Sequence, residues 1–319
     1  MSELLLRVKN LSVQFTGQRK AQALRRVSFD LAKGEVLTLL GESGCGKSVT
    51  LRTLLGLNPQ KTTQVSGEIW IHDQNTLALS ESELRQYRGR VASMVFQEPG
   101  LAFDPVFTIG DQMVEVLRAH EDIGHQAALS KALDMLERVQ IPQARKRLMA
   151  YPHELSGGMK QRAMIALALM CDPQLLLADE PTTALDASVQ IQILLLLREL
   201  QKERNMSVIF VTHDIGAAVE ISDRIAVMYA GQIVEMGSVQ KMILAPLHPY
   251  TQGLLAGSIG AEHKGQALKT IPGSPPNLSD LPKGCSFAPR CFKATAHCQQ
   301  EAPPLSTDGL EAIACWHPL

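Results

Sequence analysis

Apolar and polar residues alternate at the start of the chain and then give way to short apolar runs. The alternation over residues 4–15 predicts a strand with one solvated face, and residues 23–31 predict a second strand. Short, mostly apolar runs predict buried strands, and these lie at residues 35–40, 91–96, 175–180 and 207–212. The pattern therefore predicts an α/β fold with a largely parallel sheet and an antiparallel β subdomain.

A long helical stretch interrupts the strands in the middle of the chain. Apolar residues recur at helical spacing between Ile109 and Met149, for example at Leu129, Leu133 and Leu136. A crossover between parallel strands needs only about a dozen residues, and this stretch is longer than that. We therefore expect a helical subdomain at about residues 100–168.

One stretch after the predicted strand 35–40 fits the phosphate-binding pattern G-x-x-x-x-G-K-[ST]. It consists of Gly41, Glu42, Ser43, Gly44, Cys45, Gly46, Lys47 and Ser48, with Val49 next. Glycines let successive backbone N–H groups point at one anion. We expect Lys47 to reach the β- and γ-phosphates of a nucleotide and Ser48 to bind Mg2+. A helix predicted at residues 49–55 adds a favourable dipole.

Three apolar runs end in side chains suited to phosphate chemistry. Asp179 and Glu180 close the run at 175–180, at the kind of strand end where parallel sheets present their ligands. We expect Asp179 to hold Mg2+ and Glu180 to polarise the attacking water. Gln97 would coordinate Mg2+ or orient water, and His213 would contact the γ-phosphate. Taken alone, a glutamine or histidine at such a place is more often a surface or structural residue.

A second glycine pair opens another predicted helix. Ser156 is suited to cap this helix, and Gly157 and Gly158 allow a close backbone approach to an anion. One nucleotide does not need two such loops from a single subunit. The chain therefore carries one more phosphate-type helix terminus than its own nucleotide requires.

Phe15 ends the first predicted strand, upstream of the phosphate loop. An aromatic ring at this position could stack on the adenine of a nucleotide. The alternative is an ordinary core or edge phenylalanine, and the sequence leaves both readings open.

Composition limits the class of protein. The 319 residues carry a net charge of −1, which argues against a nucleic-acid-binding protein. The chain has no run of eighteen apolar residues and no signal-peptide pattern, so we expect it to stay in the cytoplasm. Its six cysteines are then interpreted as thiols or metal ligands rather than disulfides.

The last part of the chain, residues 256–319, differs in composition from the rest. Its prolines rule out long regular elements. It holds four of the six cysteines, Cys285, Cys291, Cys298 and Cys315, in the spacing C-x5-C-x6-C-x16-C. A small segment with little hydrophobic core needs a cross-link or a bound metal for stability, so we expect a metal-binding extension rather than scattered free thiols. Zinc is one candidate, although its sites usually show tighter C-x2-4-C pairs.

Together these motifs resemble, in order and spacing, those of the ATP-binding subunits of ABC transporters over residues 4–255. The resemblance implies a P-loop NTPase fold of the ABC ATPase type. It makes 41–48 the Walker A loop, Gln97 the Q-loop, 155–161 the signature and 175–179 Walker B. It also makes Glu180 the catalytic glutamate, 184–186 the D-loop and His213 the switch histidine.

In this family two subunits pack head to tail, and the signature of one closes over the ATP held by the other. The resemblance therefore implies a second set of residues that act in trans on the partner's ATP. These are Leu155, Ser156, Gly157, Gly158, Gln161 and Asp186. Within the chain's own site, Mg2+ would be held by Ser48, Gln97 and Asp179.

The resemblance narrows to the oligopeptide, dipeptide and nickel importer branch on residues 181–186, 229–235 and 248–251. It implies ATP-driven solute import with a second ATPase subunit, usually a different chain, two integral-membrane permeases and a solute-binding protein. The chain would then lie peripherally on the cytoplasmic face of the inner membrane. The loop 98–105 departs from the branch pattern, which puts the specificity of permease pairing in doubt.

The cysteine tail is similar to that of peptide-importer ATPases, in which such cysteines hold a 4Fe-4S cluster. Four-thiolate ligation fits this cofactor, with Zn2+ as the alternative. Nickel or metallophore uptake and export are alternatives within the same fold. A DNA-maintenance ATPase would carry a coiled coil or zinc insertion between the Walker motifs, and a translation-type protein would need two cassettes. This chain has neither feature.

Overall fold

The computed structural model describes residues 3–17, 20–183, 185–257 and 270–319. The chain folds into two compact units. The first unit comprises Met1–Leu77 and Phe210–Leu319, and the second comprises Ala78–Ile209. The chain passes between them after Leu77 and again within the strand β8 (Ser207–Thr212). Among the described residues, no helix has the length and apolar character needed to cross a membrane.

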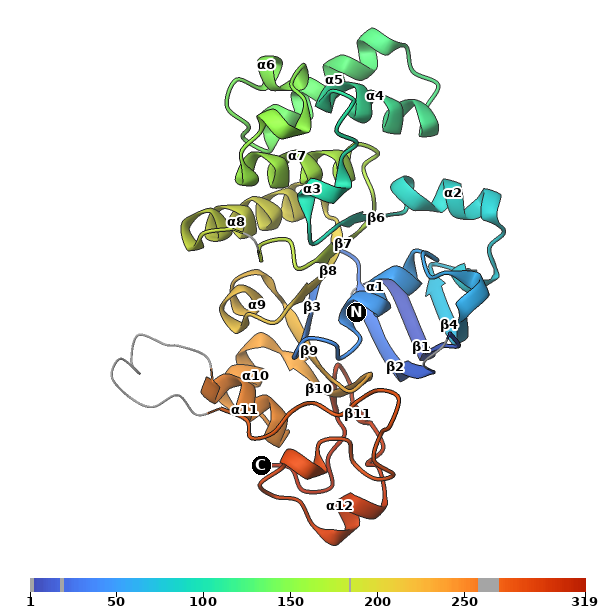
Figure 1. Cartoon of the computed structure of the whole chain (residues 1–319), viewed down its shortest axis with the longest axis vertical. Coiled ribbons are helices and arrows are strands. Elements are labelled where there is room, and N and C mark those ends of the chain that lie inside the picture. Colours follow the sequence, from blue (N-terminus) through green and yellow to red (C-terminus); the bar gives the residue numbers. More distant parts are fainter. Residues whose placement is uncertain (1–2, 18–19, 184, 258–269) are drawn as a thin grey trace. The chain divides into compact units, whose positions relative to one another are not determined.

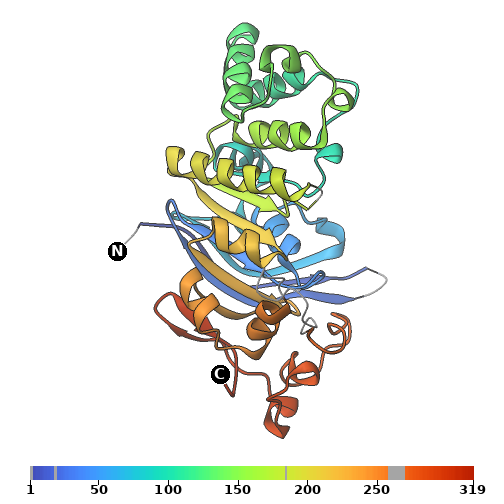
Figure 2. The same ribbon diagram turned by 90° about the vertical axis from the view of Figure 1, so that its left-hand side faces the viewer.

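An antiparallel sheet forms one part of the first unit. Its strand order is β2-β1-β4-β5, and its strands are β1 (Leu4–Phe15), β2 (Ala21–Ala32), β4 (Thr63–Ile71) and β5 (Gln74–Asn75). Alternate residues of β1 are buried, including Leu6, Val8 and Val13. The strand predicted from alternation at residues 4–15 is therefore confirmed. The long β1 and β2 appear in blue in Figure 2.

A second sheet in the first unit carries the phosphate loop. The strand β3 (Val36–Leu40) is buried at all five positions and pairs in parallel with β9 (Arg224–Tyr229). The strand β10 (Gln232–Ser238) then pairs with β9 in the antiparallel direction. The helices of this unit are α1 (Lys47–Leu54), α9 (Ile215–Ile221), α10 (Val239–Leu244) and α11 (Pro249–Gly257).

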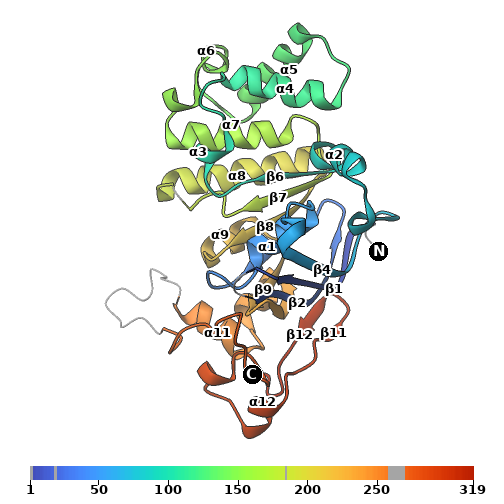
Figure 3. The ribbon, with the colours of Figure 1, turned by 45° about the vertical axis from the view of Figure 1, so that its right-hand side comes forward.

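The proline-rich tail adds its own strands to this sheet. The short strand β12 (Glu311–Ile313) pairs with β10, and β11 (Ser306–Asp308) pairs with β12. The only helix of the α type in the described part of the tail is the five-residue α12 (Ala296–Gln300). Figure 1 shows these elements in red, and Figure 3 shows β11 and β12 side by side. Over the described residues 270–319 the regular elements are all short, as the prolines predict, and this part of the tail belongs to the first unit.

The second unit is mostly helical. Two of its strands, β6 (Ala92–Val95) and β7 (Leu175–Asp179), pair in parallel. Its helices are α2 (Glu81–Arg90), α3 (Pro99–Ala102), α4 (Ile109–His120), α5 (His125–Arg138), α6 (Ala144–Leu148), α7 (Gly157–Leu169) and α8 (Ala187–Arg204). The stretch 109–149, predicted to be helical, is thus divided among α4, α5 and α6, which cluster with α7 in Figure 3.

Candidate functional site

The phosphate loop takes a backbone path that only glycine permits at its tightest point. Gly46 has φ 109° and forms the N-cap of α1. A Cβ atom there would lie 2.8 Å from the carbonyl oxygen of Ala23 and 2.8 Å from Leu24 Cδ2. The loop therefore packs directly against β2 and leads into the positive end of the α1 dipole.

The side chain of Lys47 contacts the backbone of this loop. Its ammonium group is buried and donates to the carbonyl oxygens of Gly41 at 2.7 Å and Glu42 at 3.1 Å. Ser48 and Val49 are half-buried in the first turn of α1. The Lys47 ammonium therefore lies against the loop backbone, and its contact with phosphate and the binding of Mg2+ by Ser48 stay predictions.

The remaining loop residues differ in exposure. Ser43 and Gly44 are exposed, whereas Cys45 is buried, and burial raises the pKa of its thiol. A buried, protonated thiol acts as a packing group rather than as a nucleophile. Phe15 is half-buried at the end of β1, opposite Ala21 and Thr63, so both readings of its ring stay open.

Glu42 makes contacts that the sequence does not indicate. Its carboxylate accepts two hydrogen bonds from the guanidinium of Arg290, at 2.6 and 3.0 Å. Its backbone N–H donates to the Tyr250 hydroxyl at 3.0 Å. Both partners come from the C-terminal part of the first unit. No sequence motif marks Arg290 or Tyr250 as neighbours of the phosphate loop.

The carboxylates of the second unit follow β7. Asp179 is buried at the end of this strand. The next residue, Glu180, has φ 45°, a left-handed conformation that is strained for a residue with a side chain. Its Oε2 accepts from Thr183 Oγ1 at 3.0 Å and from Gln97 Nε2 at 3.4 Å. The structure therefore brings Gln97 and Glu180 together, and strain of this kind is typical of functional positions.

The second glycine motif opens α7, as predicted. Ser156 is the N-cap, and its hydroxyl accepts from the N–H of Met159 at 3.4 Å. Ser156 and Gly157 are exposed, Gly158 is half-buried, and Leu155 and Gln161 are buried. The exposed start of this helix leaves its N–H groups accessible on the surface of the second unit.

Asp186 begins the next long helix. Its carboxylate accepts from the N–H of Val189 at 3.0 Å and from Ser188 Oγ at 2.7 Å, and the bond from Ser188 lowers the pKa of Asp186. Asp186 is thus the N-cap of α8. Ala184, the first residue of the predicted D-loop, lies outside the described residues.

His213 follows β8 in the first unit and is exposed. The neighbouring Asp214 caps α9 through hydrogen bonds from the N–H groups of Gly216 and Ala217. The strand that leads to His213 is buried at every position. The exposed His213 therefore follows directly from a fully buried strand.

The four cysteines of the tail line one cavity. One small cavity is lined by Cys285, Cys291, Cys298 and Cys315, together with Phe287 and other residues. Burial raises the pKa of the Cys285, Cys291 and Cys315 thiols, whereas backbone N–H groups that point at these sulfurs act in the opposite direction. In the described part of the chain, no group of three or more His, Cys, Asp or Glu side chains could hold a metal ion.

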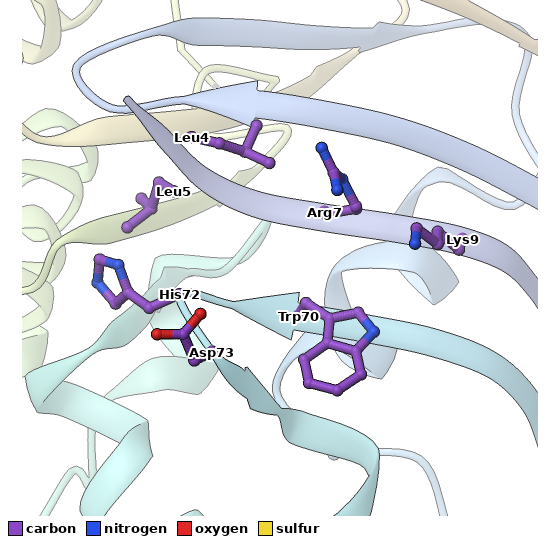
Figure 4. Close-up of a pocket in the computed structure, with 7 residues that line it drawn as sticks. All are labelled: Leu4, Leu5, Arg7, Lys9, Trp70, His72 and Asp73. Atoms are coloured by element: carbon purple, nitrogen blue, oxygen red, sulfur yellow. The ribbon is translucent and has the colours of Figure 1, made fainter. Parts of the chain in front are cut away.

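A second cavity of about 530 Å3 lies over β1 and β4 (Figure 4). Arg7 and Lys9 face it from β1, and Trp70 faces it from β4. Arg7 already pairs with Asp30 at 3.2 Å, and the Trp70 indole donates to Glu68 at 2.8 Å. None of the predicted nucleotide-binding residues lines this cavity, so it is distinct from the phosphate loop.

Comparison with protein families gives two matches. The family described as "ABC transporter" matches residues 24–183. The family described as "Oligopeptide/dipeptide transporter, C-terminal region" matches residues 234–298. The second match covers three of the four tail cysteines and also Arg290 and Tyr250.

Two similar proteins from Bacillus subtilis (strain 168) span almost the whole chain. The dipeptide transport ATP-binding protein DppD is 44% identical over 318 residues, which cover 98% of this chain and 95% of that protein. The oligopeptide transport ATP-binding protein OppD is 45% identical over 320 residues, which cover 98% of this chain and 89% of that protein.

Among solved structures, the chain is similar to the ATP-binding cassette MJ0796, seen as a dimer in a post-hydrolysis state bound to ADP and Pi. The TM-score is 0.66 at 29% identity, over 74% of this chain and 99% of that one. The similarity confirms the predicted ABC ATPase fold.

Proposed function

The chain belongs to the ABC transporter family and is an ABC ATPase, and from this premise we propose that it hydrolyses ATP to drive peptide import across a membrane. One observation carries the proposal. The chain joins a nucleotide-binding cassette at 24–183 to the C-terminal region of oligopeptide and dipeptide transporters at 234–298. Relatives named for dipeptide and oligopeptide transport cover nearly its full length, and this favours peptides over nickel as the solute.

Phosphate charge is neutralised at the Walker A loop. Lys47 binds the β- and γ-phosphates, and Ser48, Gln97 and Asp179 hold Mg2+. The buried ammonium of Lys47 supports this role, since it already lies against two loop carbonyls. A bound Mg2+ would neutralise part of the phosphate charge.

Glu180 orients the attacking water, and His213 contacts the γ-phosphate. The strained backbone of Glu180 and its hydrogen bonds to Gln97 and Thr183 support a fixed carboxylate at this position. A fixed carboxylate can accept a proton from water at the moment of in-line attack. Because both residues are present, this subunit's own site is competent to hydrolyse ATP.

The catalytic assembly contains a second ATPase subunit. The exposed start of α7, with Ser156 and Gly157, binds the ATP held by the partner, and Asp186 acts beside it. The dimeric form of the similar cassette MJ0796 supports this arrangement. The partner is a second ATPase subunit of the same family.

Permease subunits dock on the second unit. Four apolar side chains are exposed there: Val106 (69%), Phe107 (51%), Met149 (65%) and Tyr151 (40%). The two segments that carry them are adjacent, because the N–H of Ile109 donates to the carbonyl of Ala150 at 2.9 Å. An exposed apolar group of this kind is typical of a protein interface. The complete transporter also includes a solute-binding protein, and the ATPase lies peripherally at the cytoplasmic face of the membrane.

The tail cysteines hold an iron–sulfur cluster. Cys285, Cys291, Cys298 and Cys315 share one cavity, and four thiolates are the usual ligand set for a 4Fe-4S cluster. Backbone N–H groups directed at three of the sulfurs partly offset the burial that raises the pKa of these thiols. Zn2+ held by the same four thiolates is the alternative. Iron, sulfide and zinc analysis of anaerobically purified protein distinguishes the two.

The test of the proposed function is transport by the reconstituted complex. The ATPase is purified with its permeases, placed in proteoliposomes, and assayed for ATP hydrolysis and for uptake of a labelled dipeptide. Loss of a general base typically slows a reaction by a factor of about 10²–10⁴. Glu180→Gln is therefore expected to reduce ATP turnover at this site by at least a factor of about 100 and to retain ATP binding.

Glu203→Gln is the matched control. Glu203 lies in the same unit, and its exposed carboxylate pairs with Arg138. This variant should hydrolyse ATP and import dipeptide at the original rate. Unchanged turnover in Glu180→Gln would refute the assigned role, and ATP hydrolysis without any peptide uptake would refute the solute class.

A further inference from the structure

The phosphate loop is bound to the C-terminal tail by a partly buried ion pair between Glu42 and Arg290. Arg290 donates two hydrogen bonds to the carboxylate of Glu42, and its side chain is only 5% exposed. The same guanidinium donates to the carbonyl of Pro272 at 2.8 Å and to the Tyr229 hydroxyl at 3.3 Å. These bonds hold the guanidinium in one orientation. A two-point pair of this geometry is stronger and more directional than a surface ion pair.

A second contact holds the backbone of the same loop residue. The Tyr250 hydroxyl accepts from the N–H of Glu42 at 3.0 Å. Tyr250 is fully buried, and its ring packs against Tyr229 and Phe287, with centroid distances of 4.6 and 5.3 Å. Glu42 is therefore fixed at two points, by its carboxylate and by its N–H.

The fixed residue lies next to the phosphate-binding lysine. The carbonyl of Glu42 accepts from Lys47 Nζ at 3.1 Å. A shift of Glu42 would therefore move an acceptor of the lysine that the phosphates require. In addition, an unpaired Glu42 carboxylate would place a negative charge on the loop that receives a triphosphate, and like charges repel over this range.

We propose that Arg290 and Tyr250 are positioning residues of the nucleotide site, so that the affinity for ATP depends on the docked tail. Neither residue belongs to the nucleotide-binding motifs, and they act on ATP through Glu42. The inference rests on ATP binding at the Walker A loop. It assigns the turn between Cys285 and Cys291, which carries Arg290, a function in nucleotide binding that is separate from holding a cluster.

The experiment measures equilibrium binding of a fluorescent ATP analogue to the full-length protein, together with its thermal unfolding. Loss of a hydrogen bond to a charged group typically weakens an interaction by roughly tenfold or more. Arg290→Met should therefore weaken ATP binding about tenfold, and Arg290→Lys should recover part of the loss. The double variant Arg290→Met/Glu42→Gln should bind more tightly than Arg290→Met, because it also removes the exposed negative charge.

Lys241→Met is the matched control. Lys241 pairs with Glu311 of the tail strand β12, so this variant also removes a tail ion pair, but one that does not contact the phosphate loop. Its affinity for ATP should not change. Equal affinities in Arg290→Met and Lys241→Met would overturn the inference, even if both variants unfold at a lower temperature.

Tyr250→Phe covers the case in which Arg290→Met does not fold. It removes only the hydroxyl that holds the Glu42 N–H, and we expect an affinity loss of roughly threefold or more. Unchanged affinity in this variant would contradict the proposal. If the unaltered protein itself binds no ATP, the proposed function fails. If it binds ATP and the variants bind equally well, only this inference fails.

Discussion

Replacing Phe287 should reveal whether the tail and the antiparallel sheet unfold as one structure. Phe287 is 3% exposed and packs in the tail against rings from the rest of the first unit. Its ring centroid lies 5.2 Å from that of Tyr229, 5.3 Å from Tyr250 and 5.8 Å from His248. If these contacts anchor the tail, their loss should destabilise the whole unit rather than the tail alone.

The size of the effect follows from burial. Truncating a buried phenylalanine to alanine typically lowers the free energy of unfolding by about 3–5 kcal/mol. Phe287→Leu keeps most of the volume but loses the two pairs with the Tyr229 and Tyr250 rings, which are worth about 0.5–1.5 kcal/mol each, so roughly 1–3 kcal/mol is expected. Phe292 lies in the same tail but is 70% exposed. Phe292→Ala should therefore change the free energy of unfolding by less than about 0.5 kcal/mol.

Tryptophan fluorescence during urea unfolding is the appropriate assay. The chain has two tryptophans, Trp70 in β4 and Trp316 in the tail, and both lie in the first unit. In a Trp316→Phe background, the remaining signal reports the antiparallel sheet. Phe287→Ala should lower the urea midpoint of this Trp70 signal. An unchanged Trp70 midpoint would show that the tail is an independent appendage and would refute the reasoning.

Two further predictions concern the phosphate loop and a buried histidine. Gly46→Ala should weaken ATP binding by at least about tenfold, because its Cβ would clash with Ala23 and Leu24. Gly44→Ala has φ 78° but open space, so equilibrium binding should show a smaller loss. Burial lowers the pKa of His248 to about 4. As pH falls below about 6.5, the His248 imidazole therefore takes up a proton in the unfolded chain before it does so in the folded one. The free energy of unfolding, measured by urea titration, should drop by about 2 kcal/mol by pH 5. His248→Gln should not show this drop.

The strands were predictable because their signal is local. The boundaries predicted at 4–15 and 207–212 match β1 and β8. A strand with one buried face alternates apolar and polar residues, and a strand buried on both faces gives a short apolar run. The division of the stretch 109–149 into three helices was missed, although Thr108 and Asp111 form a capping box that marks the first start.

The tail was harder to place because its partners are distant in sequence. A cysteine-rich extension was expected from composition alone. Its strand β12 instead continues the sheet through the pairing of Ile313 with Glu235. Three-residue strands carry too few positions to show a period. Only the tertiary contact defines them.

Glu42 shows why the nucleotide site could be predicted only in part. The motif predicts a phosphate loop at this position, because a phosphate cradle requires glycines, lysine and a hydroxyl at fixed spacing. The residues between those fixed positions were assigned to ATP only by their place in the pattern. The carboxylate of Glu42 instead pairs with Arg290, 248 residues away. A motif position that any residue can fill is free to form a contact with another part of the fold. Here that contact is the Glu42–Arg290 pair, which joins the tail to the predicted phosphate loop.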